Sequence, residues 1–247
     1  MSTPDPLDAY ISTVTGQLDG LREQADAIRR AGEAVAATIA ADGLRHVFGT
    51  GHSHLLAEEL FYRAGGLAAV NPVLIEGLLL HAGAELSTSM ERTAGLGAVI
   101  FDRLGAAPVD TMLVATNSGS NIIARELVER ARDHGMTTIA IVSLAHATSA
   151  SSRGAGARRV DEIADIVIDN LGRPGDAAIA VPGVELPMGP TSTVMGAAIV
   201  NAVAMTAAAI AAERGVQPVV FTSSNVAGGD ERNRAALERY RARVRSL

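Results

Sequence analysis

Residues 45–64 read RHVFGTGHSHLLAEELFYRA, which joins a short apolar strand to a small polar turn and then to an apolar helix. The turn is Gly49-Thr-Gly-His-Ser53, and the pair Gly65-Gly66 ends the helix. The same order returns further along, where the strand TMLVA (111–115) runs into the turn TNSGSN (116–121) and another helix. Such units predict parallel strands in one sheet, with a ligand site at the carboxyl ends of the strands.

The remaining apolar segments continue this alternation along the chain. Short apolar runs predict strands, and longer periodic segments predict helices that cover both faces of the sheet. Strands are expected at 68–75 (broken by Asn71-Pro72), 137–142, 164–169 and 219–221, and helices at 6–30, 31–41, 191–214 and 231–244. We therefore expect an α/β fold with three layers, an α/β/α sandwich around a central parallel sheet. One domain is expected over residues 1–247, with N-terminal helices at 1–42 as an extension and the α/β core at 43–247.

The composition excludes several classes of function. Only 3% of the 247 residues are aromatic, whereas proteins that bind single-stranded nucleic acid use aromatic side chains as stacking platforms. The net charge of −6 offers no basic field to a polyanion, so no nucleic-acid partner is expected. The chain contains no cysteine, which excludes disulfides and thiolate zinc sites and fits a cytoplasmic location.

The most apolar long run, residues 194–212, is rich in alanine and contains Asn201. A membrane-spanning helix needs about 20 strongly apolar residues, so this run predicts a buried core helix and no membrane partner. The first nine residues lack the apolar stretch of a signal peptide.

The two polar turns have the composition of an anion site. The first turn of a helix leaves backbone N–H groups without partners, and the helix dipole favours a negative group there. Glycines allow close approach of the backbone to an anion, and hydroxyls add hydrogen-bond donors. These residues are Gly49, Thr50, Gly51 and Ser53 in the first turn and Thr116, Ser118, Gly119 and Ser120 in the second. The alternative is that they are ordinary turn residues and helix caps. A dinucleotide site is disfavoured because His54 occupies the third position of G-x-G-x-x-G.

Five segments together carry a family resemblance: HVFGTGHSHLLAEELFYRAGG (46–66), ATNSGSN (115–121), VIDN (167–170), GPTSTVMGA (189–197) and SNVAGGDERN (224–233). In these the chain resembles the SIS (sugar isomerase) domain family, whose members bind phosphosugars on a flavodoxin-like or Rossmann-like fold. The resemblance implies a sugar-phosphate ligand and no cofactor. It also implies a homodimer or homotetramer whose active site borrows residues from a neighbouring subunit.

The resemblance also implies which side chains contact the ligand. Ser53, Ser118 and Ser120 would hold the phosphate, and Asn117, Gly119 and Asn121 would complete the second loop, with Gly51 and Thr116 beside them. Thr191 and Ser192 would line the sugar pocket, although capping of the long helix is the default interpretation for both. The C-terminal segment often reaches the sugar site in this family, which makes Asn225 a candidate for hydroxyl contacts.

Two residues are candidates for proton transfer. Aldose–ketose interconversion needs a group that moves a proton between adjacent carbons, and a carboxylate in a partly dry pocket suits this task. The related phosphoheptose isomerases carry an Ala-Glu-Glu-Leu stretch whose second glutamate is functional, which would correspond to Glu59, although here the pair lies one helical turn closer to the serine. His81 would be a ring-opening or proton-shuttling group, and it shares a face with Glu85 if residues 78–90 are helical. Glu59 could equally be a surface or interface charge, and His81 could equally be a core or interface histidine.

A metal site formed by His52, His54 and Glu59 is a weaker alternative, because the spacing does not reproduce the metal site of phosphoheptose isomerase. The leading hypothesis is a phosphosugar isomerase that acts through an enediol, with Glu59 and His81 as acid–base groups. A lyase or etherase on the same phosphate grip and a non-catalytic phosphosugar sensor remain as alternatives.

Overall fold

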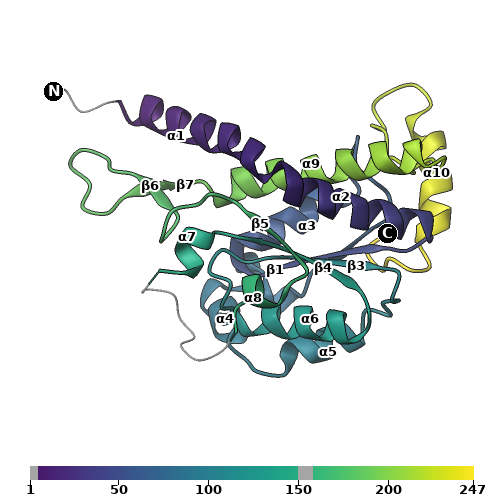
Figure 1. The fold of residues 1–247 in the computed structure, drawn as a ribbon, viewed down its shortest axis with the longest axis horizontal. Helices are drawn as coiled ribbons and strands as arrows, with labels where there is room; N and C mark the ends of the chain where they lie inside the picture. The colour runs from purple at the N-terminus through teal and green to yellow at the C-terminus, as the bar shows by residue number, and fades with distance from the viewer. Residues whose placement is uncertain (1–4, 150–157) are drawn as a thin grey trace.

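A computed structural model describes residues 5–149 and 158–247 of the chain. Its centre is a five-stranded sheet in the order β2-β1-β3-β4-β5, in which every neighbouring pair is parallel (Figure 1). The strands are β1 (Arg45–Gly49), β2 (Val70–Val73), β3 (Thr111–Ala115), β4 (Thr137–Val142) and β5 (Ile166–Asp169). Their side chains alternate between two apolar clusters, one on each face of the sheet. The expected parallel α/β/α sandwich is confirmed.

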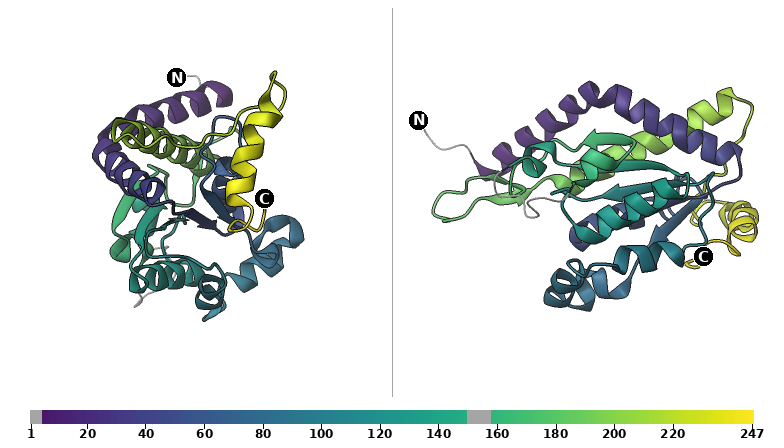
Figure 2. Two further views of the ribbon diagram at one scale, coloured as in Figure 1. Left: turned by 90° about the vertical axis from the view of Figure 1, so that its right-hand side faces the viewer. Right: turned by 60° about the horizontal axis from the view of Figure 1, so that its bottom comes forward.

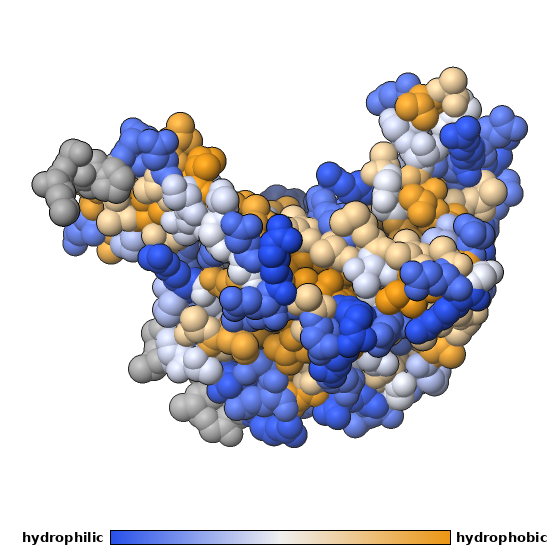
Figure 3. Space-filling model, turned by 45° about the horizontal axis from the view of Figure 1, so that its top comes forward, coloured by the Kyte–Doolittle hydropathy of each residue, from blue (hydrophilic) through white to orange (hydrophobic). Residues whose placement is uncertain are grey.

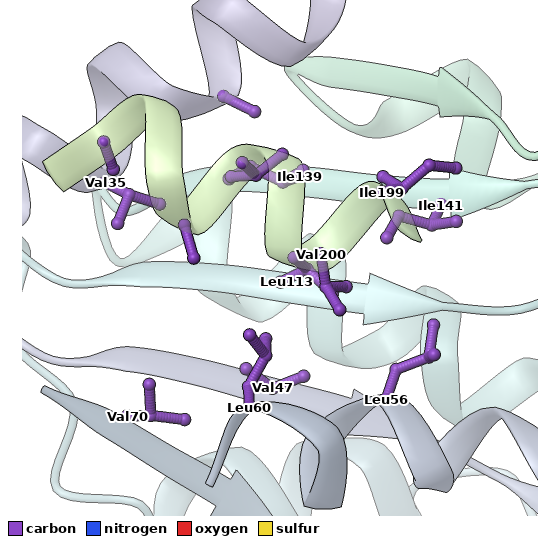
Figure 4. Packing of buried hydrophobic residues seen from close by; sticks show 14 of the residues in the cluster. Val35, Val47, Leu56, Leu60, Val70, Leu113, Ile139, Ile141, Ile199 and Val200 are labelled. Carbon is purple, nitrogen blue, oxygen red and sulfur yellow. The ribbon is translucent and has the colours of Figure 1, made fainter. Parts of the chain in front are cut away.

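Helices cover both faces (Figure 2). One face carries α2 (Ala25–Ala40), α3 (Leu55–Leu60) and α9 (Ser192–Glu213), and the other carries α4 (Ala84–Met90), α5 (Leu96–Asp102), α6 (Ile122–Asp133) and α8 (Val160–Ile163). Figure 4 shows Leu113 and Ile141 next to Val200 and Ile199 of α9, and Val47 next to Leu60 of α3.

The apolar helix α9 is part of this core. Its buried residues recur at helical spacing along one face. Gly32 of α2 permits close packing, because a Cβ at this position would lie 2.6 Å from Thr206 Cγ2. By length and composition α9 could also cross a membrane, but a single helix of this kind says little, since core helices meet the same criteria.

An arm projects from one end of the sandwich (Figure 1). We define the arm as α1 (Pro6–Gly20) together with the antiparallel hairpin β6 (Ala177–Ile179) and β7 (Met188–Pro190). The Tyr10 hydroxyl donates a hydrogen bond of 3.1 Å to the Pro190 carbonyl and so joins the two parts. A short 3-10 turn, Leu21–Gln24, connects α1 to α2. The hairpin has no counterpart among the sequence predictions.

The opposite end is closed by α10 (Gly229–Tyr240), which packs against Leu44 and Ala68 where the strands begin. The strand expected at 219–221 is not formed. Phe221 instead exchanges hydrogen bonds with Gly65 and Gly66 (2.8 and 2.9 Å), next to an isolated bridge between residues 67 and 220.

Two further expectations differ from the structure. The break expected at Asn71-Pro72 is absent, because β2 is an edge strand and tolerates a proline. Residues 78–90 do not form one helix, since Gly83 adopts a φ of 138° between a 3-10 turn at Leu80–Ala82 and α4. His81 and Glu85 therefore do not share a helix face.

Candidate functional site

The turns after β1 and β3 lie side by side at the point where the strand order reverses. From β1 the sheet continues to β2 on one side, and from β3 it continues to β4 on the other. The two strands are in register, with Gly49 beside Ala115, so both turns begin at the same level. In an open parallel sheet this switch point leaves a crevice in which ligands bind.

Local backbone requirements shape the first turn. A Cβ at Gly49 would collide with the carbonyl oxygen of Ser53, so only glycine lets the chain fold back over the end of β1. Gly51 adopts a φ of 53° and starts the 3-10 turn Gly51–His54. The Ser53 N–H donates to the Thr50 carbonyl (3.0 Å). These constraints place Ser53 above the strand end.

The second turn leads into α6. Asn121 is the N-cap of this helix, and its side-chain oxygen accepts a hydrogen bond of 3.1 Å from the Ala124 N–H. Gly119 has a φ of 68°, which a residue with a side chain rarely adopts. The Ser120 hydroxyl donates to the Ser118 hydroxyl at 3.1 Å, so the two serines face the same space.

Side-chain hydrogen bonds connect the two turns to each other and to a third segment. The Asn121 amide donates to the Thr50 hydroxyl at 3.0 Å. Thr50 and Asn121 both donate to Oε2 of Glu91, at 3.1 and 3.3 Å. Glu91 directly follows α4. Glu91 therefore belongs to the same hydrogen-bonded unit as the two turns.

These segments surround a polar cavity of about 390 Å³, a volume within the usual range for small-molecule sites. Its described lining residues are Thr50, Ser53, Glu91, Arg92, Thr116, Asn117, Ser118, Ser120, Asn121, Ile122 and His146. The structure thus brings together six of the predicted ligand-binding residues, namely Ser53, Thr116, Asn117, Ser118, Ser120 and Asn121.

The cavity has the donors that a phosphate requires. Hydroxyl groups and the N-terminus of the twelve-residue α6 are directed to it, and Arg92 and His146 are further donors in its wall. His146 Nδ1 accepts a hydrogen bond of 2.9 Å from the Gly175 N–H, so its ring proton is on Nε2.

Arg92, Glu91 and His146 were not predicted from the sequence. Each follows or lies within a short helix, and neither helix follows a glycine-rich polar turn of the kind seen after β1 and β3. Only the packing of α4 and of α7 (Leu144–Ala147) therefore reveals them. The one local sign was the position of His146 shortly after a buried parallel strand, β4.

The residues at the start of α9 are engaged with another carboxylate. Asp176, with a φ of 65°, accepts hydrogen bonds from the backbone N–H groups of Thr191 (3.1 Å) and Ser192 (3.0 Å). Its other oxygen lies 2.5 Å from the Ser192 hydroxyl. Thr191 is fully buried, whereas Ser192 lines a small neighbouring pocket with Ser53 and Asn117.

Three other predicted residues lie outside the cavity. The Glu59 carboxylate contacts Arg63 and Asn201, each at 2.8 Å, between α3 and α9. The His81 side chain is 64% exposed and lies 3.4 Å from Glu76. Asn225 is an exposed residue of the loop before α10, the helix that packs where the strands begin.

The histidines of the first turn make separate contacts. The His54 ring contacts the Gly51 carbonyl and lies 3.4 Å from Glu58, while His52 lines the small pocket next to Ser53. Within residues 5–149 and 158–247, no three His, Asp or Glu side chains come together as a set of metal ligands.

A larger, shallower hollow of about 720 Å³ lies at the other end of α6. It is lined by Arg132 and Asp165, which pair with each other at 3.1 Å. The strands begin at this edge, so the hollow lies away from the switch point.

Comparisons with known proteins agree with this architecture. The family model of the SIS domain matches residues 9–143. A UPF0309 protein of Geobacillus thermodenitrificans is 40% identical over 239 residues, which cover 96% of this chain and 96% of the relative. A UPF0309 protein of Brucella canis is 39% identical over 237 residues, with 96% of each chain covered.

Among solved structures, a phosphoheptose isomerase from Francisella tularensis superposes with a TM-score of 0.52 at 18% identity, covering 84% of this chain and 98% of that one. The phosphoheptose isomerase of Neisseria gonorrhoeae gives a TM-score of 0.50 at 16% identity, covering 83% and 97%. At these identities the likeness concerns the fold. By its sequence match and its architecture, the chain belongs to the SIS-domain family.

Proposed function

We propose that this protein is an aldose–ketose isomerase of a sugar phosphate, acting through an enediol. The observation that carries the proposal is the convergence of two hydroxyl-bearing turns and the N-terminus of α6 on one polar cavity at the switch point. This arrangement suits a phosphate dianion, and the cavity extends beyond the serines to a carboxylate and a histidine that can contact the sugar. The structural neighbours named phosphoheptose isomerase support the same class of reaction.

The phosphate is held without lysine, because every basic residue of the sequence other than histidine is arginine. Ser53, Ser118 and Ser120 supply hydroxyl donors, and Arg92 is the cation in the described cavity wall. The Ser118→Ala variant should bind inorganic phosphate about tenfold more weakly, since hydrogen bonds to charged groups contribute about 1.5–3 kcal/mol. Ser89→Ala is the control, because Ser89 is exposed and its hydroxyl donates to the Glu85 carbonyl of its own helix, α4.

We further propose that the protein is a homo-oligomer assembled through the arm. No residue of α1 is buried in a single chain, and Leu7 and Ile11 are 66% and 55% exposed. Leu186 of the hairpin is 71% exposed. Figure 3 shows apolar surface on the arm and a hollow between the arm and the C-terminal part of the chain. Contiguous exposed apolar surface of this kind is typical of an interface.

Ile11→Arg should therefore shift the protein toward a monomer in size-exclusion chromatography with light scattering. Val109→Arg is the control, because Val109 is also about half exposed but lies before β3, away from the arm. Glu59 and His81 could reach a substrate only if such an assembly placed them at the cavity of another subunit.

Incorporation of solvent deuterium into the sugar tests the reaction itself. The protein is incubated with a panel of sugar 6-phosphates in deuterated water, and each sugar is followed by NMR. Deuterium at the carbon next to the carbonyl, together with ketose formation, is the expected result. Loss of a substituent would indicate a lyase, and binding without exchange would indicate a sensor; either outcome would overturn the proposal.

A further inference from the structure

The cavity contains one carboxylate among its described lining residues, that of Glu91. Glu91 is half-buried, and its Oε2 accepts hydrogen bonds from the Thr50 hydroxyl (3.1 Å) and the Asn121 amide (3.3 Å). Both donors are neutral groups on the turns that border the phosphate position. The carboxylate is therefore held at the cavity wall in a fixed orientation, as a group that transfers protons must be.

A hydrogen-bond donor of known tautomer lines the same cavity. His146 Nδ1 accepts the Gly175 N–H at 2.9 Å, which places the ring proton on Nε2. His146 can therefore donate to an oxygen of a substrate, while its Nδ1 stays engaged with the backbone. Such a donor stabilises negative charge that develops on a carbonyl oxygen.

We propose that Glu91 is the catalytic residue that carries the proton between the two carbons, and that His146 donates to the oxygen that becomes negative. This assignment rests on the proposed isomerase function. The Glu91 carboxylate removes the proton from the carbon beside the carbonyl; the C–H electron pair forms the C=C bond, and the carbonyl π pair moves to oxygen. The carboxylic acid then returns the proton to the former carbonyl carbon, while the neighbouring hydroxyl proton passes to the enediolate oxygen. The carboxylate is regenerated without an oxidant or reductant.

The position of Glu91 distinguishes it from Glu59, the carboxylate favoured by the sequence. Both oxygens of Glu59 are engaged outside the cavity, with Arg63 and Asn201. Glu91 instead accepts a hydrogen bond from Asn121, which belongs to the same turn as Ser118 and Ser120. A carbon chain attached to a phosphate in these turns meets Glu91 within the same cavity.

The test compares three glutamine variants of the full chain in the deuterium-exchange assay with any sugar phosphate that the wild type converts. Glu91→Gln preserves the shape and the hydrogen-bond acceptor but cannot take up a proton. Its exchange rate should fall at least about 100-fold, while its affinity for inorganic phosphate stays within about twofold of wild type. Glu85→Gln is the matched control, because Glu85 is an exposed residue on α4. Glu59→Gln is the competing variant.

The outcomes separate the assignment from the function on which it rests. Exchange by the wild type and equally fast exchange by Glu91→Gln would remove Glu91 and leave the isomerase in place. A large loss in Glu59→Gln with normal Glu91→Gln would assign the proton transfer to Glu59 instead. Absence of exchange in the wild type, with phosphate binding intact, would overturn both proposals. If Glu91→Gln does not fold, Glu91→Asp is used; partial exchange with unchanged phosphate affinity supports the assignment, and wild-type exchange contradicts it.

Discussion

The side-chain amide of Asn121 donates a hydrogen bond of 3.0 Å to the hydroxyl of Thr50, and this contact joins the turn after β1 to the first turn of α6. The two residues are 71 positions apart in the sequence. Since the side-chain oxygen of Asn121 also caps α6, one residue fixes both the helix start and the spacing of the two turns. This contact therefore holds the two turns of the proposed phosphate site at a fixed spacing.

Replacement of Asn121 separates these two roles. Asn121→Ala removes the cap and the hydrogen bond to Thr50. It should lower the free energy of unfolding by about 1 kcal/mol and also weaken phosphate binding. Asn121→Asp retains a capping oxygen but loses both amide donors and places a second carboxylate beside Glu91, so it should lose affinity with less loss of stability. Thermal unfolding and phosphate titration measure the two effects. Equal affinity in Asn121→Asp and wild type would show that the hydrogen bond to Thr50 does not shape the site.

Gly49 is expected to tolerate no side chain. A Cβ there would overlap the Ser53 carbonyl oxygen, and the backbone on that side cannot move without displacing Ser53. Gly49→Ala should therefore destabilise the protein by at least about 2 kcal/mol and abolish phosphate binding. Gly16→Ala provides the comparison, because nothing lies within 4 Å of the added Cβ in α1 and the change favours the helix. A Gly49→Ala protein that binds phosphate normally would contradict the placement of Ser53.

The sequence predicted those parts of the site that short local patterns of residues encode. The turns 49–53 and 116–121 carry glycines and hydroxyls directly after buried strands, and the parallel sheet brings such turns to one edge. The residues missed, Glu91 and His146, enter the cavity through the packing of short helices against that edge. No local spacing encodes such packing.

The structure places Glu59, Thr191 and Ser192 outside the cavity for which the sequence predicted them, and each case has a physical cause. Glu59 follows the first turn by only a few residues, but the rotation of α3 directs its carboxylate to Asn201 of α9. For Thr191 and Ser192, the helix start was recognised correctly, but a third residue, Asp176, occupies it. Distance along the chain was a poor guide to direction in both cases.

A buried polar network at the opposite edge of the sheet should control the acid stability of the fold. Asp110 accepts hydrogen bonds from the N–H groups of Leu44 (2.7 Å) and Ala107 (2.8 Å) and from His46 Nε2 (3.1 Å). Asn71 donates to His46 Nδ1 at 2.9 Å, which directs the ring proton to Asp110. Burial alone would raise the pKa of Asp110, but these hydrogen bonds outweigh it and hold the pKa below its usual 3.8.

Because the folded-state pKa of Asp110 is below the unfolded one, its stabilisation is present above about pH 4 and is lost as the pH falls through the folded-state value. Asp110→Asn should lower stability by about 2 kcal/mol at pH 7 and show a smaller loss of Tm on acidification than wild type. Calorimetry between pH 7 and pH 3 measures both. Parallel Tm curves for the two proteins would show that Asp110 does not contribute to acid sensitivity.

Arg45 should destabilise the fold at neutral pH. It is 1% exposed, and none of its three guanidinium nitrogens has a hydrogen-bond partner among the described residues. Burial lowers the pKa of Arg45 to about 10. At pH 7 the side chain is charged in both the folded and unfolded states, so this difference opposes folding by up to about 3 kcal/mol. The penalty decreases only as the pH rises above about 10, where the folded state releases the proton first.

Arg45→Met fills a similar volume without a charge and should raise the Tm by several degrees, as replacement of buried charges by apolar residues can do. Arg45→Ala removes the charge as well but leaves a cavity, so its Tm should lie below that of Arg45→Met. Calorimetry at pH 7 to 9 measures the order of the three Tm values. The Tm difference between Arg45→Met and wild type should be constant across this pH range. A lower unfolding temperature for Arg45→Met than for wild type would show that other interactions offset the penalty of burying the guanidinium. The buried charge would then stabilise the start of β1.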